Sequence, residues 1–139
     1  MTRIVLKGRK VVGGVTEGEA LVTSQTISTW GGVDAVKGII TEQRHELRGQ
    51  CFKDKILVFP SAKGSSGWST MAQMIRLAGQ SPKAMVIRDI NSLSGIGAVV
   101  MCVPTVTDLD QDPTKVITSG DWVKIDGDNG IVEVIKKIA

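Results

Sequence analysis

The sequence predicts an α/β domain that is rich in strands and arranged in β/β/α layers. Short apolar runs alternate with turns, and the 139 residues include 16 glycines that separate these elements. Helical periodicity occurs only in the middle of the chain, between apolar runs, which indicates β-α-β units there. We expect one domain spanning residues 1–139, because this length suits a single hydrophobic core.

The first half of the chain is expected to contain mainly strands and turns. In chain order these are a strand at 3–12 bent at Gly8, a strand at 18–23, a glycine turn at 30–34, a short strand at 38–42, an irregular stretch at 44–51 and a strand at 55–59. The last of these is a continuous apolar run, which is typical of a strand buried on both faces.

The second half is expected to continue as alternating helices and strands and to close with a hairpin. The elements are a helix at 66–78, a strand at 84–87, a short helix at 92–99, a strand at 102–106, a solvated acidic turn at 108–112 and a hairpin pairing 121–126 with 130–135. The glycine and asparagine between the last two runs favour a hairpin connection.

The helix at 66–78 has the clearest periodicity. Its apolar residues recur at spacings of three and four and define one face: Trp68, Met71, Ile75 and Ala78, with Met74 beside them. Ser65 or Ser66 can cap the start of this helix, and Gly79 fits its C-terminal end.

Composition and charge exclude several classes of function. The net charge of +3 is too small to indicate nucleic-acid binding, and two Phe, three Trp and no Tyr offer few stacking platforms. No apolar run is long enough to span a bilayer, so no membrane association is expected. Because residues 1–7 show no signal-peptide pattern, we expect a cytoplasmic location.

The potential metal ligands are few. Cys51 and Cys102 are far apart in the sequence and are expected to be free thiols, and His45 is the only histidine. An iron–sulfur cluster or a zinc ion usually needs three or four protein ligands. We therefore expect this chain to bind no metal or cofactor by itself.

The segment KGSSG at residues 63–67 is the strongest candidate for a site. It lies between a buried strand and a helix, where free backbone N–H groups and the helix dipole favour an anion. Gly64 and Gly67 would let the backbone approach a ligand closely, and Ser66 adds a hydroxyl. The alternative is that the serines only cap the helix. The spacing matches neither a phosphate-binding P-loop nor a nucleophile elbow.

Three further groups are weaker candidates. Asp34, in the turn that begins at Trp30, could be a polar contact in a pocket, or Trp30 could simply pack on the core. Arg48, with Arg44, could bind a carboxylate or phosphate through its guanidinium, although such pairs are commonly solvated. His45 lies in a charged stretch and is expected to be a solvated loop residue, so no hydrolase triad is expected.

The closing hairpin resembles that of swivelling domains, including the phosphohistidine domains of phosphotransfer enzymes. Those domains carry phosphate on a histidine in a Thr/Ser-x-His turn, and this sequence has no such histidine. The resemblance therefore supports a swivelling β/β/α architecture and excludes phosphotransfer through histidine.

Taken in order, the motifs resemble the small subunit of aconitase X, the swivel domain of a hydro-lyase. The matching segments are 17–22, 30–34 with 38–40, 47–50, 56–60 leading into 63–66, Gly97 with Ala98, and the closing hairpin. They cover nearly the whole chain.

This resemblance implies a dehydratase subunit that is inactive without its large subunit, in a heterodimer or higher heteromer. The large subunit would hold an iron–sulfur cluster, and the small subunit would contribute Ser65 as the base that removes a proton next to a carboxylate. A helix N-terminus can stabilise the serine alkoxide. The sequence departs from ordinary aconitase at Gly67, where an arginine is expected, so carboxylate binding by that arginine does not carry over.

Two hydroxy acid substrates are compatible with the resemblance. We favour cis-3-hydroxy-L-proline, because the bulky Trp68 would suit a compact molecule; the alternative is mevalonate 5-phosphate. A different class also stays open, in which the domain is non-catalytic and the turn at Ser65 binds an anion or caps a helix.

Overall fold

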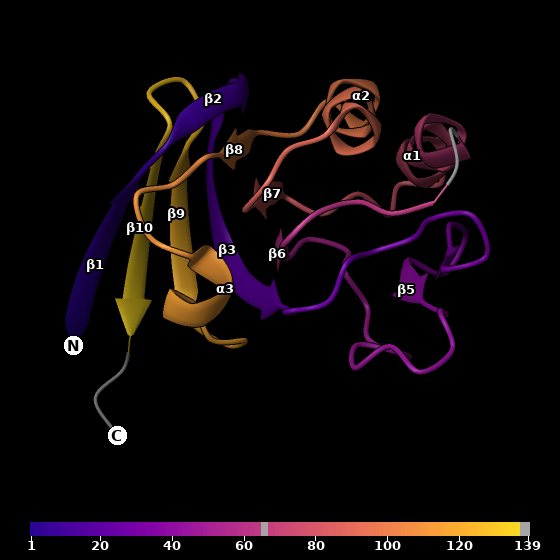
Figure 1. Cartoon of the computed structure of the whole chain (residues 1–139), viewed down its shortest axis with the longest axis horizontal. Helices are drawn as coiled ribbons and strands as arrows, with labels where there is room; N and C mark the ends of the chain where they lie inside the picture. The colour runs from indigo at the N-terminus through magenta and orange to yellow at the C-terminus, as the bar shows by residue number, and fades with distance from the viewer. Residues whose placement is uncertain (65–66, 137–139) are drawn as a thin grey trace.

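The computed structural model describes residues 1–64 and 67–136 and has a mixed α/β fold (Figure 1). Its eight-stranded sheet has the order β1-β10-β9-β3-β6-β7-β8-β2. The strands are β1 (Thr2–Lys7), β2 (Arg9–Val12), β3 (Val15–Val22), β6 (Ile56–Phe59), β7 (Ala84–Ile87), β8 (Thr105–Thr107), β9 (Trp122–Asp126) and β10 (Ile131–Lys136). A small separate pair is formed by β4 (Val33–Asp34) and β5 (Ile39–Ile40). The helices are α1 (Gly67–Leu77), α2 (Ser92–Met101) and α3 (Pro113–Val116).

The large sheet is curled because one bent strand supplies both of its ends. β1 and β2 are consecutive in the chain but lie at opposite ends of the strand order. They meet at Gly8, whose N–H donates to Gly130 O at 2.8 Å. A Cβ at Gly8 would collide with the carbonyl oxygen of Thr107. The expected bend at Gly8 is therefore confirmed, and glycine is required there by close backbone approach.

The middle of the sheet is parallel and buried on both faces. β3, β6, β7 and β8 run parallel to one another, and every residue of β6 and β7 is buried. Alternate residues of β6 face different clusters: Leu57 and Phe59 pack on the side of α1 and α2, whereas Ile56 and Val58 pack against β9 and β10. This gives the expected β/β/α layers, with α1 and α2 opposite the β1-β10-β9 portion in Figure 1.

The helix α1 forms where its periodicity predicts, but its buried face differs from the expected one. Trp68, Ala72 and Ile75 are buried, whereas Met74 is 46% exposed. Ala78 is exposed because α1 ends at Leu77, just before Gly79 turns the chain with φ of +71°. The spacing 68, 72, 75 follows the 3.6-residue period closely, so Ala72 takes the central place on this face.

Two boundaries in the second half also differ from expectation. The strand expected at 102–106 is β8 at Thr105–Thr107, because α2 continues to Met101 and Cys102 caps it in the left-handed conformation with φ of 59°. After the acidic turn, the chain forms the short helix α3, which was not expected. Asp112 caps α3 through Thr114 N, and Pro113 begins it, which is a usual start for a helix.

The closing hairpin is confirmed. β9 and β10 pair antiparallel in register from Ile131 with Asp126 to Ile135 with Trp122. β3 then pairs with the other edge of β9, and it begins at Val15, three residues before the expected strand. Of the short strand expected at 38–42, only Ile39–Ile40 is in strand conformation.

Candidate functional site

The candidate turn lies at the carboxyl end of β6, in the parallel part of the sheet. Ser65 and Ser66 lie outside the described residues, so the site is built from the residues on either side. Gly64, just before the serines, has φ of +107°, a conformation that favours glycine. Gly67 begins α1. Carboxyl ends of parallel strands are where open α/β sheets gather ligands.

The segment before the serines is fixed to a neighbouring loop. Ile27 pairs with Ala62 as a parallel bridge, and its N–H donates to Ser61 O at 3.1 Å. The N–H of Lys63 donates back to Ile27 O at 3.0 Å. Ser28 lies beside Gly64, since its Oγ is 3.3 Å from where a Cβ would be. Residues 61–63 are therefore held by the loop that contains Ile27.

The start of α2 holds the same segment from the other side. Asn91 Nδ2 donates to Ala62 O at 2.8 Å and to Ser61 Oγ at 3.1 Å. Asn91 Oδ1 accepts from Ser94 N at 3.0 Å, and Ser94 Oγ accepts from Asn91 N at 3.2 Å, which together form a capping box. The two turns that follow β6 and β7 are thus joined by one side chain.

Lys63, the charged residue of the candidate turn, has a fixed partner. Its Nζ lies 2.7 Å from Glu42 Oε1. The other carboxylate oxygen, Glu42 Oε2, is buried without a hydrogen-bond partner among the described residues and lies 3.8 Å from His45 Nε2. This ion pair ties the turn to the loop that follows β5.

His45 is buried, so the expectation of a solvated loop histidine is wrong. Its side chain is 2% exposed. The backbone N–H of Leu47 donates to Nδ1 at 3.0 Å, which places the ring proton on Nε2, and Nε2 lies 3.2 Å from Thr26 O. The imidazole therefore has a structural role, in which it connects the loop at 42–48 to the loop at 23–28.

An open polar hollow lies between these loops, beside Lys63. Its volume is about 350 Å³, and its walls carry Arg44, Lys63, Glu42 and Gln25 among other residues. Arg44 is exposed and has a left-handed backbone with φ of 65°. Arg48 is also exposed, but it does not line the hollow.

The structure does not bring Asp34 to the candidate turn. Its Oδ1 accepts from the N–H groups of Val36 and Lys37, each at 3.0 Å, so the carboxylate caps its own turn. The tip of this turn contacts the chain after the other end of α1, where Gln80 Nε2 donates to Val36 O at 2.8 Å. The eleven residues of α1 span about 16 Å, which separates the two places.

Trp30 is 64% exposed, so packing of its indole on the core is wrong. The expected tight turn is present: Gly31 has φ of +77°, and a Cβ on Gly32 would collide with the carbonyl oxygen of Ser28. The glycines let the chain fold back closely and leave the indole at the surface.

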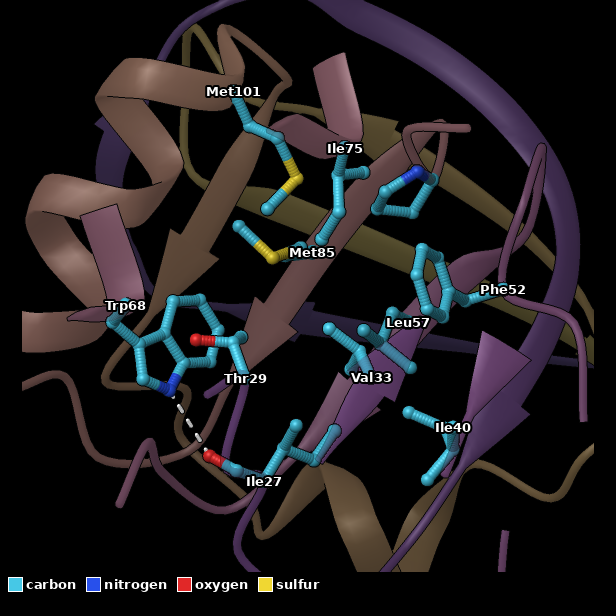
Figure 2. A pocket seen from close by; sticks show the side chains of 11 residues that line it. Ile27, Thr29, Val33, Ile40, Phe52, Leu57, Trp68, Ile75, Met85 and Met101 are labelled. Atoms are coloured by element: carbon cyan, nitrogen blue, oxygen red, sulfur yellow. Dashed lines mark hydrogen bonds between the residues drawn. The ribbon is translucent and has the colours of Figure 1, made fainter. Parts of the chain in front are cut away.

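Trp68 lies inside the domain and does not face the outside of the turn (Figure 2). It is 2% exposed, its Nε1 donates to Ile27 O at 3.1 Å, and its ring stacks on Phe59 with centroids 6.2 Å apart. It borders an apolar cavity of about 20 Å³, which has room for about one water molecule. The indole of Trp68 is therefore part of the hydrophobic core.

Among residues 1–64 and 67–136, no group of three or more His, Cys, Asp or Glu side chains could hold a metal ion. Cys51 and Cys102 are free and exposed, as expected for reduced thiols. Over the same residues, no helix is long and apolar enough to cross a membrane.

Comparison with known proteins identifies the family. The model of the aconitase X swivel domain matches residues 5–134. The chain belongs to the aconitase X swivel domain family. The phosphomevalonate dehydratase small subunit of Methanococcoides burtonii is 36% identical over 99% of this chain and 100% of its own. That of Thermococcus sibiricus is 40% identical over 93% of this chain and 97% of its own.

Solved structures agree with this assignment. The crystal structure of Thermococcus kodakaraensis aconitase X in its holo-form superposes with a TM-score of 0.90, at 36% identity, over 96% of this chain and 99% of the matched chain. A related protein solved by NMR in solution gives a TM-score of 0.84 at 34% identity, over 96% of this chain and all of its own. The swivelling fold expected from the sequence is confirmed.

Sequence reasoning missed Glu42, Asn91 and Gln25, which support or border the turn. The Asn91 cap has a detectable signal, because Asn is a favoured N-cap residue and directly precedes the helix. Glu42 and Gln25 have no comparable signal, since their contacts depend on loops that meet only in the folded chain.

Proposed function

We propose that this chain is the small subunit of a phosphomevalonate dehydratase, a hydro-lyase of the aconitase X type. One observation supports this most strongly: curated relatives with that name match it nearly end to end, at 36% and 40% identity for the two described above. Such coverage leaves no additional catalytic domain in those relatives that this chain lacks. The name "small subunit" further supports a large-subunit partner.

Mevalonate 5-phosphate is the better supported of the two substrates considered. The preference for cis-3-hydroxy-L-proline rested on the bulk of Trp68, and that side chain is 2% exposed within the core. The relatives' names also support the phosphorylated substrate. We therefore adopt mevalonate 5-phosphate for this proposal.

In the proposed reaction, Ser65 accepts a proton from the carbon next to the substrate carboxylate. The C–H electron pair forms the new C=C bond, and the C–O bond at the neighbouring carbon breaks with loss of hydroxide. The hydroxide takes a proton from solvent to become water, and Ser65 returns its proton to solvent. The anchoring of residues 61–63 by Ile27 and Asn91 supports this role, because a base must be held in a defined position.

The surroundings of the turn suit an anionic substrate. The eleven-residue helix α1 begins at Gly67, so its dipole favours negative charge near its start. Backbone contacts from Gly64, Ser66 and Gly67 and a side-chain contact from Arg48 belong to this proposal. The iron–sulfur cluster, which would supply the Lewis acid for departure of hydroxide, is assigned to the large subunit.

The test is to express the small and large subunits together and assay the complex with each substrate. We expect the complex to remove water from mevalonate 5-phosphate, as measured by mass spectrometry of the product. We expect no turnover by the small subunit alone. Water loss from cis-3-hydroxy-L-proline only would contradict the proposed substrate. A complex that dehydrates neither compound would contradict the proposed function.

A further inference from the structure

We infer that the hollow between the loops at 23–28 and 42–48 binds the phosphate group of the substrate, with Arg44 as its main anchor. This inference rests on the proposed function. The hollow lies beside Lys63, two positions before Ser65 in the chain, and its volume is about 350 Å³. In mevalonate 5-phosphate, the phosphate lies at the opposite end of the carbon chain from the carboxylate. This substrate therefore requires a second subsite, separate from the one that receives its carboxylate end.

The guanidinium of Arg44 is available to a ligand. Arg44 is exposed and lines the hollow, and no carboxylate within residues 1–64 and 67–136 forms an ion pair with it. A guanidinium can donate two parallel N–H bonds to phosphate oxygens, which combines charge with geometric specificity. Arg44 therefore offers the unpaired positive charge that a phosphate needs.

The backbone that carries Arg44 is fixed in advance. Arg44 has φ of 65°, a strained conformation for a residue with a side chain. The next residue, His45, is buried and holds the loop through Thr26 O and Leu47 N. On the other side, Glu42 is bound to Lys63. An anchored loop loses little conformational entropy when a ligand binds.

Gln25, from the other loop that lines the hollow, supplies a neutral donor. Its Oε1 accepts from the backbone N–H of Glu46 at 2.9 Å, which orients the amide and leaves the Nε2 hydrogens for other acceptors. Gln25 lines the hollow together with Arg44. Its amide N–H groups can therefore complement the guanidinium around a phosphate.

Among the described residues that line the hollow, the carboxylate of Glu42 is the one negative group, and its charge is balanced. Glu42 Oε1 lies 2.7 Å from Lys63 Nζ, and Oε2 is buried, so neither oxygen presents a free charge to a ligand. With Lys63 and Glu42 counted as a neutral pair, Arg44 leaves the lining with a net positive charge. This balance favours an anion.

The test compares Arg44→Gln with Lys53→Gln in the complex of both subunits. Lys53 is exposed in the turn before β6, at the opposite end of that strand, so its replacement removes the same charge away from the hollow. Gln retains the Cβ and so leaves the backbone strain at position 44 unchanged. For mevalonate 5-phosphate, we expect Arg44→Gln to raise KM about 10- to 100-fold with kcat changed less than about threefold.

Inorganic phosphate serves as the second probe. We expect it to inhibit the wild-type complex competitively and the Arg44→Gln complex much more weakly, while Lys53→Gln behaves as wild type. If the complex dehydrates mevalonate 5-phosphate but Arg44→Gln leaves both KM and phosphate inhibition unchanged, the subsite is wrong and the proposed function stands. If the wild-type complex dehydrates only cis-3-hydroxy-L-proline, the proposed function fails, and the phosphate subsite fails with it.

Discussion

Two strand-to-helix turns lie side by side at the same end of the parallel sheet, and they are stabilised differently. In the turn after β7, the backbone N–H groups of Asn91 and Ser94 are hydrogen-bonded by the turn's own side chains, since these two residues form a reciprocal cap of α2. The turn after β6 is held by residues from elsewhere in the chain. Ile27, Asn91 and Glu42 all contact residues 61–63, which precede the two serines.

This difference separates a structural turn from a turn available for chemistry. A self-contained capping box uses its polar groups to satisfy helix N–H groups, so few remain for a ligand. The described part of the α1 turn is instead anchored from outside, and Asn91 of the α2 turn supplies one of those anchors.

The largest change in stability is expected from Asn91→Ala, which tests whether the α2 turn supports both turns. The change removes the cap of α2 and the bonds to Ser61 and Ala62, so we expect a loss of about 1–2 kcal/mol in the free energy of unfolding. We also expect reduced kcat, because the α1 turn loses an anchor. Denaturant unfolding and steady-state kinetics of the complex measure the two effects.

Ser92→Ala is the control for Asn91→Ala. Ser92 is exposed at the first position of α2, next to the cap, so we expect its replacement to change stability by less than about 0.5 kcal/mol. Equal effects of the two variants would show that the cap does not join the turns.

A smaller, pH-dependent effect is expected at Glu46, in the loop that borders the hollow. The hydroxyl of Thr23 and the N–H of Ser24 donate to its carboxylate and hold its pKa below the ordinary value of 4.5. Because the folded-state pKa is lowered, the stabilisation is fully present above the unfolded-state pKa and is lost as the pH falls through the folded-state value.

We therefore expect Glu46→Gln to lower the free energy of unfolding by about 1 kcal/mol or less at neutral pH. In acid, the free energies of unfolding of the variant and the wild type should become more similar. Unfolding curves recorded across this acid range measure the change. As a control, Glu19→Gln removes an exposed carboxylate that pairs with Lys55. A constant difference between Glu46→Gln and wild type at every pH would contradict the assignment.

The sequence allowed the core to be predicted far better than the polar loops. The continuous apolar runs of β6 and β7 require burial on both faces, and the spacing of Trp68 and Ile75 defines the inner face of α1. The burial of the His45 side chain could not be predicted in this way, because it depends on Thr26, nineteen positions earlier in another loop. Local periodicity carries no information on such contacts.

The end of α2 and the start of β8 were also difficult to predict from the sequence, for a different reason. Cys102 adopts a left-handed conformation that glycine usually provides, so the end of α2 had no glycine signal. The curled sheet likewise depends on Gly8 lying against Thr107, a contact between distant segments. In the candidate site, the turn could be located from the sequence, but the hollow beside it could not.

The most direct test of the difference between the turns compares the kcat of two variant complexes. One complex carries Ser65→Ala and the other carries Ser94→Ala. Ser94 is buried in the α2 capping box, so its loss should cost stability but change kcat less than about threefold. Loss of the proposed base at Ser65 should lower kcat by about 100- to 10,000-fold, with unchanged unfolding and unchanged association with the large subunit. A Ser65→Ala complex with kcat near wild type would contradict the catalytic role and favour a turn that only caps α1.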